Sequence, residues 1–204
     1  MRLQRGQLYI ISAPSGTGKT TLSRRLLNGF PNIRESVSYT TRLPRAGEKD
    51  KVDYIFVSVE TFTEMLKSNA FIEHAQVHGN LYGTALATLQ EVLSEGNDVL
   101  LDIDTQGARQ IRNKHVKSTS IFIIPPSIDV LYQRLKNRNT ESDEVIRRRM
   151  EKARDEVREG MLYDYIIVND NLDQALMELS SIIMANRVRG NCIDRDWVEK
   201  TFNI

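Results

Sequence analysis

A polar, glycine-broken stretch near the amino terminus constrains the fold of this chain more than any other feature. Residues 12–21 read SAPSGTGKTT and directly follow the apolar run LYII at residues 8–11. A buried strand, then GxxxxGK[ST], then a helix forms the P-loop, whose backbone N–H groups bind phosphate oxygens. Gly18, Lys19 and Thr20 fit this pattern, whereas Ala13 stands at its first glycine position and Gly16 supplies extra backbone freedom. We therefore expect a phosphate-binding loop between a strand and a helix.

The rest of the chain predicts the sheet to which that first strand belongs. Three further apolar runs have the length and β-branched content of strands buried on both faces. Helical patterns alternate with them: a leucine stripe ends at Gly29, and Ser127 can cap a second helix. This order predicts an α/β chain with a P-loop three-layer fold, in which helices cover a parallel sheet. The three runs occupy residues 99–103, 121–124 and 165–168.

Two segments interrupt the alternation. Residues 38–96 combine a stretch rich in Pro, Gly and charge with strand-like patterns at YIFV and FIEHAQV, and with a helix expected from Thr84 to Glu95. They predict a small mixed α/β insertion with its own sheet. The second segment, residues 137–160, contains a charged helix that Ser142 opens, with five Arg and one Lys against six acidic residues from Ser142 to Gly160. This balance predicts a helix crossed by salt bridges and not a basic patch.

Composition bears on partners and location. The 28 Lys and Arg against 27 Asp and Glu leave a formal charge of +1, so we expect neither a nucleic-acid nor a membrane partner. No apolar run approaches the roughly 18 residues of a membrane-spanning helix. The single cysteine, Cys192, excludes an internal disulfide and suits a reducing compartment, so we expect a cytoplasmic protein.

Two aspartates lie at the end of the strand predicted at residues 99–103, Asp102 within it and Asp104 directly after it. A P-loop Mg²⁺ usually requires an aspartate at the end of another core strand, and Asp102 and Asp104 stand there. Such an aspartate is often only a helix cap. The residues that follow, Thr105-Gln106-Gly107, favour a ligand-binding role for these aspartates, because ligands bind outside the carboxyl ends of parallel strands. The hydroxyl of Thr20 and the carboxylate of Asp102 are the predicted ligands of Mg²⁺, directly or through water.

A second anion site is predicted within the insertion. Arg42 and Arg45 lie three residues apart beside two threonines, and Tyr54 and Tyr82 follow in strand-like segments. Two fixed guanidiniums with tyrosine hydroxyls suit a second phosphate. Either tyrosine could instead merely pack, since aromatic residues are common in strands.

Four segments behind the P-loop, SVSYTTRLPRAGE, FIEHAQVHGNLYGT, DIDTQGA and IIVNDN, resemble the guanylate kinase family in order and spacing over about residues 6–190. The resemblance implies transfer of the γ-phosphate of Mg·ATP to GMP, and to dGMP, with Mg²⁺ as cofactor. It also implies a P-loop CORE (residues 1–37, 97–133 and 161–204), a GMP-binding insertion (38–96) and a helical LID (134–160). It leaves open whether the protein is a monomer or a homo-oligomer.

The resemblance also assigns roles to individual residues. The ATP-binding loop comprises Ala13, Pro14, Ser15, Gly16, Thr17, Gly18, Lys19, Thr20 and Thr21. The resemblance assigns binding of the GMP phosphate to Arg42, Arg45, Tyr54 and Tyr82. It assigns binding of the guanine to Ser38, Glu73, Thr84 and Asp104. The catalytic set is Lys19, Arg42, Arg134, Arg138 and Arg149. The sequence departs from the family at Asn139, where glycine is usual, and at Asn171, where a second aspartate is common.

Several alternatives stay open at this point. A guanylate-kinase-like binding module without catalysis is one, although Lys19, Thr20 and Asp102 argue against it. A P-loop GTPase is disfavoured because no NKxD sequence occurs. Glu73 could be a solvent-facing strand residue paired across a sheet. Residues 192–204 predict a helix that packs on the CORE or meets a neighbouring molecule.

Overall fold

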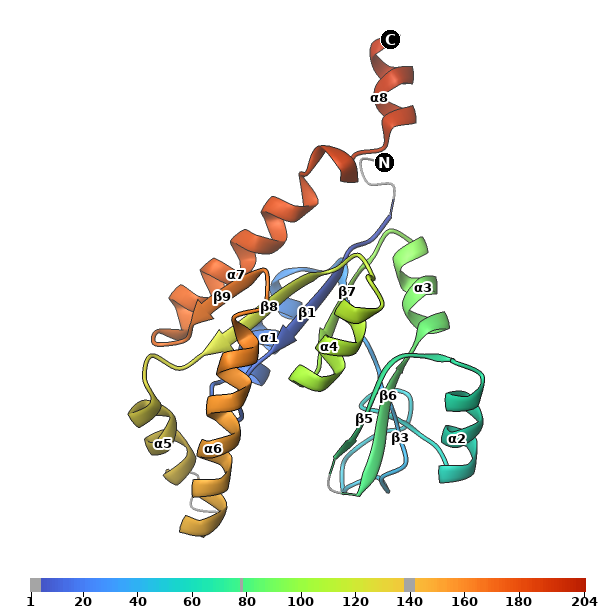
Figure 1. Ribbon diagram of the computed structural model, residues 1–204. Coiled ribbons are helices and arrows are strands. Elements are labelled where there is room, and N and C mark those ends of the chain that lie inside the picture. Colours follow the sequence, from blue (N-terminus) through green and yellow to red (C-terminus); the bar gives the residue numbers. More distant parts are fainter. Residues whose placement is uncertain (1–4, 78, 138–141) are drawn as a thin grey trace.

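The central element of the fold is a parallel sheet of five strands. The structure, a computed structural model, describes residues 5–77, 79–137 and 142–204. The sheet has the order β2-β7-β1-β8-β9, and all its strand pairs are parallel (Figure 1). The predicted parallel sheet is confirmed, with β2 as an additional short edge strand. Its strands are β1 (Leu8–Ser12), β2 (Ile33–Glu35), β7 (Asp98–Asp102), β8 (Thr119–Ile124) and β9 (Tyr165–Val168).

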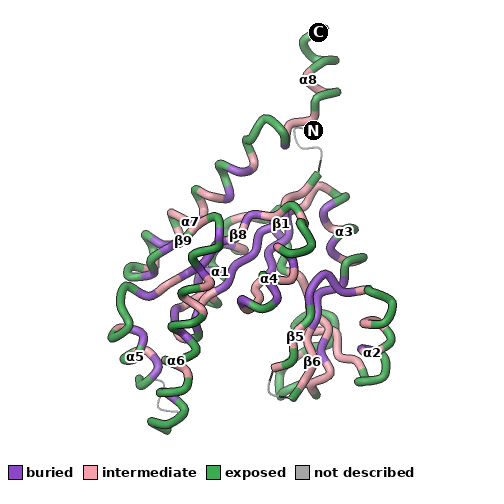
Figure 2. The backbone as a smooth tube through the Cα atoms, in the orientation of Figure 1, coloured by how far each residue is buried: buried purple, intermediate pink, exposed green. Residues whose placement is uncertain are grey.

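Helices cover both faces of this sheet. Alternate residues of β1 enter different cores, with Tyr9 and Ile11 in one and Leu8 and Ile10 in the other. A strand covered on both faces has no solvent side, which explains the uninterrupted apolar run. Figure 2 shows the buried residues gathered along these strands. The first core includes residues of α1 (Lys19–Gly29) and α7 (Leu172–Arg187), and the second includes residues of α3 (Leu86–Ser94) and α4 (Thr105–Asn113).

A second, smaller sheet has the order β4-β3-β6-β5 and lies beside the first (Figure 1). Phe62 and Phe71 stack in its core with ring centroids 4.5 Å apart. The helix predicted from about Thr84 is confirmed, but α3 begins two residues later at Leu86, because Thr84 pairs with Glu73 in the antiparallel ladder. The elements are β3 (Tyr39–Thr40), β4 (Ile55–Phe56), α2 (Val59–Lys67), β5 (Phe71–Val77) and β6 (Asn80–Ala85).

Two helices form a third group beside the carboxyl end of β8. In α5 (Ile128–Lys136), the predicted cap is confirmed, since the Ser127 side chain accepts a hydrogen bond from the N–H of Val130. The charged helix is also confirmed as α6 (Asp143–Gly160), which packs on α5 around Leu131 and Ile146. A Cβ at Gly160 would lie 2.2 Å from the Phe122 ring, so α6 can approach the sheet this closely only with glycine there.

The carboxyl-terminal segment leaves the body of the molecule. After the short 3-10 helix η1 (Gly190–Cys192), α8 (Arg195–Phe202) extends away from the sheet (Figures 1 and 2). The helix is as predicted, but α8, all of whose residues are described, contains no buried residue and does not pack on the core. Across the described ranges, no helix is long and apolar enough to cross a membrane.

Candidate active site

The loop that joins β1 to α1 has a backbone shaped to bind an anion. Gly16 and Gly18 both adopt φ of 94°, a left-handed conformation that favours glycine. The buried Thr17 donates from its hydroxyl to the Pro14 carbonyl at 2.9 Å, which closes the loop on itself. Gly18 is the N-cap of α1, so the unpaired N–H groups of the first helical turn lie at the loop. This is the geometry in which backbone N–H groups bind phosphate.

Asn169, which the sequence-based assignment omitted, supports the loop from β9. Its side-chain amide donates to the Thr17 carbonyl at 2.6 Å and would lie 2.6 Å from a Cβ at Gly18. Glycine is thus required at position 18 for its φ and for this close contact. The sequence did carry a signal, because Asn169 is the first polar residue after the apolar run of β9.

Two of the predicted catalytic arginines also contact this region. Arg134, on α5, donates to the carbonyls of Thr17 at 3.4 Å and Asn169 at 3.0 Å. Arg149, on α6, donates to the Ser15 hydroxyl at 2.8 Å. The structure therefore brings guanidiniums from two helices to the phosphate-binding loop. Arg138, the third predicted arginine, and Asn139 lie outside the described residues.

Lys19 and Asp102 form an ion pair between the start of α1 and the end of β7. The Ser23 hydroxyl is 3.4 Å from the other oxygen of Asp102. Burial lowers the pKa of Lys19 to about 8, against the opposing charges of Asp104, Glu156 and Glu35. The side chain therefore stays mainly cationic at neutral pH, with its ammonium held beside the loop.

Thr20 and Asp102 line one cavity of about 450 Å³. Hydroxyl and carboxylate oxygens are the ligands that Mg²⁺ prefers, so these residues fit the predicted metal. In the part of the chain that the structure describes, no three His, Cys, Asp or Glu side chains are grouped to hold an ion. A bound Mg²⁺ would therefore complete its shell with phosphate oxygens and water. Ser38, Tyr54 and Thr84 of the insertion line the same cavity, as do Arg24 and Glu35.

Glu73 lies in the buried wall between the two sheets. Its carboxylate accepts a 2.6 Å hydrogen bond from the Thr84 hydroxyl, which in turn lies 3.4 Å from the Ser38 hydroxyl. The solvent-facing alternative is wrong, since Glu73 is 5% exposed. Burial raises the pKa of the Glu73 carboxyl and the Thr84 hydrogen bond opposes that rise. The structure thus brings three of the four predicted guanine-binding residues into one polar chain.

Asp104, the fourth of these residues, has a structural role in this state. It is the N-cap of α4, and its carboxylate accepts a 3.0 Å hydrogen bond from the N–H of Gly107. Its negative charge also helps to raise the pKa of Glu73. A Cβ at Gly107 would lie 2.7 Å from a carboxylate oxygen of Glu73, so glycine there permits α4 to approach. Asp104 therefore does cap α4, and its predicted role in binding stays a prediction.

The predicted phosphate-binding arginine of the insertion already holds a carboxylate. Arg42 donates to both oxygens of Glu48, at 2.9 and 3.0 Å, and its guanidinium lies over the Tyr54 ring at 5.4 Å. The rings of Tyr54 and Tyr82 meet edge to face at 5.9 Å. Arg45 contributes its backbone N–H to Glu48 at 2.8 Å, while its side chain is exposed. Glu48 was not assigned from sequence, because a glutamate in a charged loop has many possible partners.

Comparisons with known proteins give one consistent result. The family model described as guanylate kinase matches residues 5–186. The guanylate kinase of Geobacter metallireducens is 52% identical over 184 residues, which cover 90% of this chain and 91% of that protein. The guanylate kinase of Syntrophotalea carbinolica is 53% identical over 188 residues, covering 92% and 90%. The crystal structure of guanylate kinase from Anaplasma phagocytophilum superposes with a TM-score of 0.78 at 34% identity, covering 100% of this chain and 99% of that one.

Proposed function

The chain belongs to the guanylate kinase family, and from this premise we propose that it transfers the γ-phosphate of Mg·ATP to GMP, and to dGMP, giving ADP and GDP. One observation carries the proposal beyond family membership. The cavity that Thr20 and Asp102 line on the P-loop side is the same cavity that Ser38 and Thr84 line on the insertion side. A donor and an acceptor nucleotide would therefore meet across a single space.

The donor side of this cavity is assigned to ATP. The N–H groups of the loop at residues 13–21 bind the phosphates, and Lys19 exchanges Asp102 for phosphate oxygens when ATP enters. Asp102, freed from the ammonium, becomes available with the Thr20 hydroxyl to hold Mg²⁺, directly or through water. A bound Mg²⁺ would supply positive charge that neutralises the phosphates.

The acceptor side is assigned to GMP. Guanine presents N1–H and N2–H₂ donors on its pairing edge, so an ionised Glu73 can accept from it, whereas adenine presents an N1 acceptor there. Ser38, Thr84 and Asp104 supply the further polar contacts of the base. Arg42 exchanges the Glu48 carboxylate for the GMP phosphate, with Arg45, Tyr54 and Tyr82 around it.

Transfer between two bound nucleotides requires little covalent chemistry from the protein. The acceptor phosphate oxygen attacks in line while Lys19 and the arginines stabilise the charge that spreads over the transferring group. Arg134 and Arg149 already contact the loop where that group forms. We assign Arg138 to the same task by family resemblance.

The proposal includes closure of two mobile parts over the CORE. We assign the two moving parts to the insertion at residues 38–96 and the LID at residues 134–160, whose closure would exclude water from the transferring phosphate. An enzyme that consumes ATP is expected where ATP is abundant, so the proposal includes a cytoplasmic location. Either a monomer or a homo-oligomer is compatible with a site contained in one chain.

The decisive experiment measures ADP release from Mg·ATP with GMP, AMP, CMP, UMP and dTMP as separate acceptors. We expect GMP to exceed every other acceptor by roughly 10²-fold or more in kcat/KM, because among these bases only guanine presents two adjacent donors, N1–H and N2–H₂, to a buried carboxylate. Release of ADP with no acceptor at all would indicate an ATPase. Binding of GMP without any ADP release would indicate the non-catalytic module instead.

A further inference from the structure

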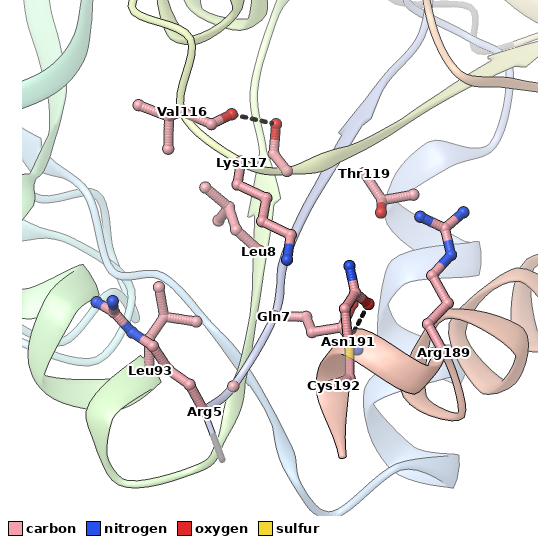
Figure 3. Close-up of a pocket in the computed structure, with 12 residues that line it drawn as sticks. Arg5, Gln7, Leu8, Leu93, Val116, Lys117, Thr119, Arg189, Asn191 and Cys192 are labelled. Carbon is pink, nitrogen blue, oxygen red and sulfur yellow. Dashed lines mark hydrogen bonds between the residues drawn. The ribbon is translucent and has the colours of Figure 1, made fainter. Parts of the chain in front are cut away.

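A second cavity lies at the amino ends of the central strands, whereas the P-loop follows the carboxyl end of β1. It has a volume of about 470 Å³ and is bordered by the first residues of β1 and β8 and by the segment that joins α7 to η1 (Figure 3). The length of β1 therefore separates the cavity from the P-loop by roughly 15 Å at about 3.3 Å per residue. The cavity is therefore distinct from the candidate active site.

The cavity wall combines an apolar part with positively charged side chains. Leu8, Leu93 and Val116 supply an apolar part, while Arg5, Lys117 and Arg189 bring positive charge from three separate segments. None of the residues that line it is Asp or Glu. Among the described residues, none of these three cations takes part in an ion pair. Three like charges around one cavity repel one another, so an anion bound there would be stabilised.

Hydrogen-bond donors gather at one side of the cavity. In Figure 3 the ammonium of Lys117 is directed toward Gln7 and Asn191, and the guanidinium of Arg189 lies beside Thr119. The side-chain oxygen of Asn191 accepts from the Cys192 thiol at 3.3 Å, which leaves its NH₂ group to donate. Ammonium, amide and guanidinium donors in one place suit a ligand that carries several acceptor oxygens.

The wall is held in place by the fold and is not a chance gap between loops. The buried Asn186 accepts from Gln7 at 2.9 Å through its carbonyl and from Thr119 at 3.4 Å through its side chain. Gly6 donates to the Leu93 carbonyl at 2.9 Å, and a Cβ at Gly6 would lie 1.7 Å from the Asn97 carbonyl oxygen. Residues just before β1 and from β8, α3 and α7 thus fix the geometry before any ligand binds.

We propose that this cavity binds a small organic phosphate, whose phosphate group lies between Lys117 and Arg189 and whose apolar part contacts Leu8 and Val116. The volume suits a molecule of about mononucleotide size, since ligand pockets of roughly 300 to 1,000 Å³ hold compounds of that order. A dianionic phosphate is favoured over a carboxylate, because two separated cations and an amide donor match its larger charge and its three terminal oxygens.

The test is a titration of the ¹⁵N-labelled full chain at constant ionic strength, followed by amide chemical shifts. Phenyl phosphate, inorganic phosphate, phenol and benzoate are the four probes. Amides at residues 117–119 and 189–192 report on this cavity, and amides at residues 15–19 report separately on the P-loop. We expect saturable shifts at the first set, with phenyl phosphate binding about fivefold or more tightly than each other probe, because it alone uses both halves of the cavity.

Matched variants decide whether these side chains are responsible. Lys117→Gln combined with Arg189→Gln should weaken phenyl phosphate at the cavity about tenfold or more, because both charge-assisted donors are lost, while binding at the P-loop stays unchanged. Arg34→Gln combined with Lys67→Gln removes the same charge from exposed positions outside both sites and should leave both affinities intact. Thermal unfolding midpoints of both variants confirm that each is folded.

Three results would overturn the proposal. Shifts at the cavity that never saturate would show only general ionic effects. Equal binding of benzoate and phenyl phosphate would refute the phosphate assignment. Unchanged affinity in the Lys117→Gln, Arg189→Gln variant would place the ligand elsewhere.

Discussion

At the scale of single residues, two cations of the candidate active site are paired with carboxylates, which the phosphates of the substrates are proposed to replace. Lys19 contacts Asp102 and Arg42 contacts Glu48, so these two of the cations proposed to bind phosphate have a carboxylate partner before phosphate arrives. The partner spares the site the free energy of an unpaired buried charge. Substrate binding is then an exchange of one anion for another, and its free energy is the difference between the two.

The first prediction concerns Lys19. We expect Lys19→Met to remain folded and to slow transfer by a factor on the order of 10² or more, because a preorganised charge at the transferring phosphate is worth several kcal/mol. In the unaltered chain, kcat/KM for ATP should fall as pH rises above about 8, where Lys19 loses its proton. The variant should lack that alkaline decline. Rapid turnover in Lys19→Met, measured by ADP release, would remove Lys19 from the site.

The second prediction concerns the base that is read. Glu73→Gln keeps the size of the side chain and lets its amide present a donor, so GMP should lose about 1–3 kcal/mol of transition-state binding while AMP gains or stays level. Burial raises the pKa of Glu73, so its carboxylate is protonated at a higher pH than that of an ordinary glutamate. As the pH falls, kcat/KM for GMP should therefore decline as Glu73 takes up its proton. The variant should not show this acid decline. Glu64→Gln, at an exposed position on α2, is the control. An unchanged GMP to AMP ratio would mean that Glu73 does not read guanine.

How far the sequence predicts this site depends on where each partner lies along the chain. Gly16 and Gly18 were predictable, because their positions follow from a local pattern and a local backbone conformation. The support that Asn169 gives to Thr17 spans 152 positions and exists only once β9 has joined the sheet. The Arg42 pair with Glu48 is short-range, but a flexible charged loop offers several partners, and only the folded insertion selects one.

At the scale of helices and strands, the prediction succeeded where hydrophobic patterning was long and failed where it was short. The four apolar runs became strands of the central sheet, and β1, β7 and β8 are buried on both faces. Two-sided burial was wrong for β9, because it is an edge strand whose Ile166 and Val168 are 41% and 47% exposed. β2 and β3 contain three and two residues, too few for a period to be visible. Thr84 was placed in a helix because its helix-compatible neighbours outweighed a cross-strand pairing that the sequence does not display.

The contact between α6 and the central sheet supplies the third prediction. Gly160→Ala places a methyl group 2.2 Å from the ring of Phe122, which is fully buried and cannot move freely. Overpacking of this kind should lower the free energy of unfolding by about 1–3 kcal/mol, despite the better helix propensity of alanine. Gly190→Ala, where no atom lies within 4 Å of the new methyl, should have little effect. Urea unfolding of both variants measures the difference, and equal midpoints would show that α6 adjusts without cost.

At the scale of the whole molecule, the two parts beside the cleft are expected to move toward each other. The fourth prediction is that non-hydrolysable ATP and GMP analogues together reduce the radius of gyration more than either alone, because each ligand is proposed to contact the CORE and either the insertion or the LID. Small-angle scattering of the free, singly bound and doubly bound forms measures this. An identical radius in all four samples would argue that the site works without closure.

The strand order also has a consequence for synthesis on the ribosome. β1 emerges first, yet its neighbours in the sheet are about 90 and 110 residues further along, so its hydrogen bonds must wait for most of the chain. The hairpin of β5 and β6, whose pairings are close in sequence, can form earlier. We expect stalled nascent chains from which β7 but not β8 has left the tunnel to protect the hairpin from protease while β1 stays cleavable, with protection of β1 gained once β8 has also left the tunnel. Protection of β1 at the earlier length would mean that β7 alone suffices. On this account the segment proposed to bind phosphate is translated among the first and folds among the last.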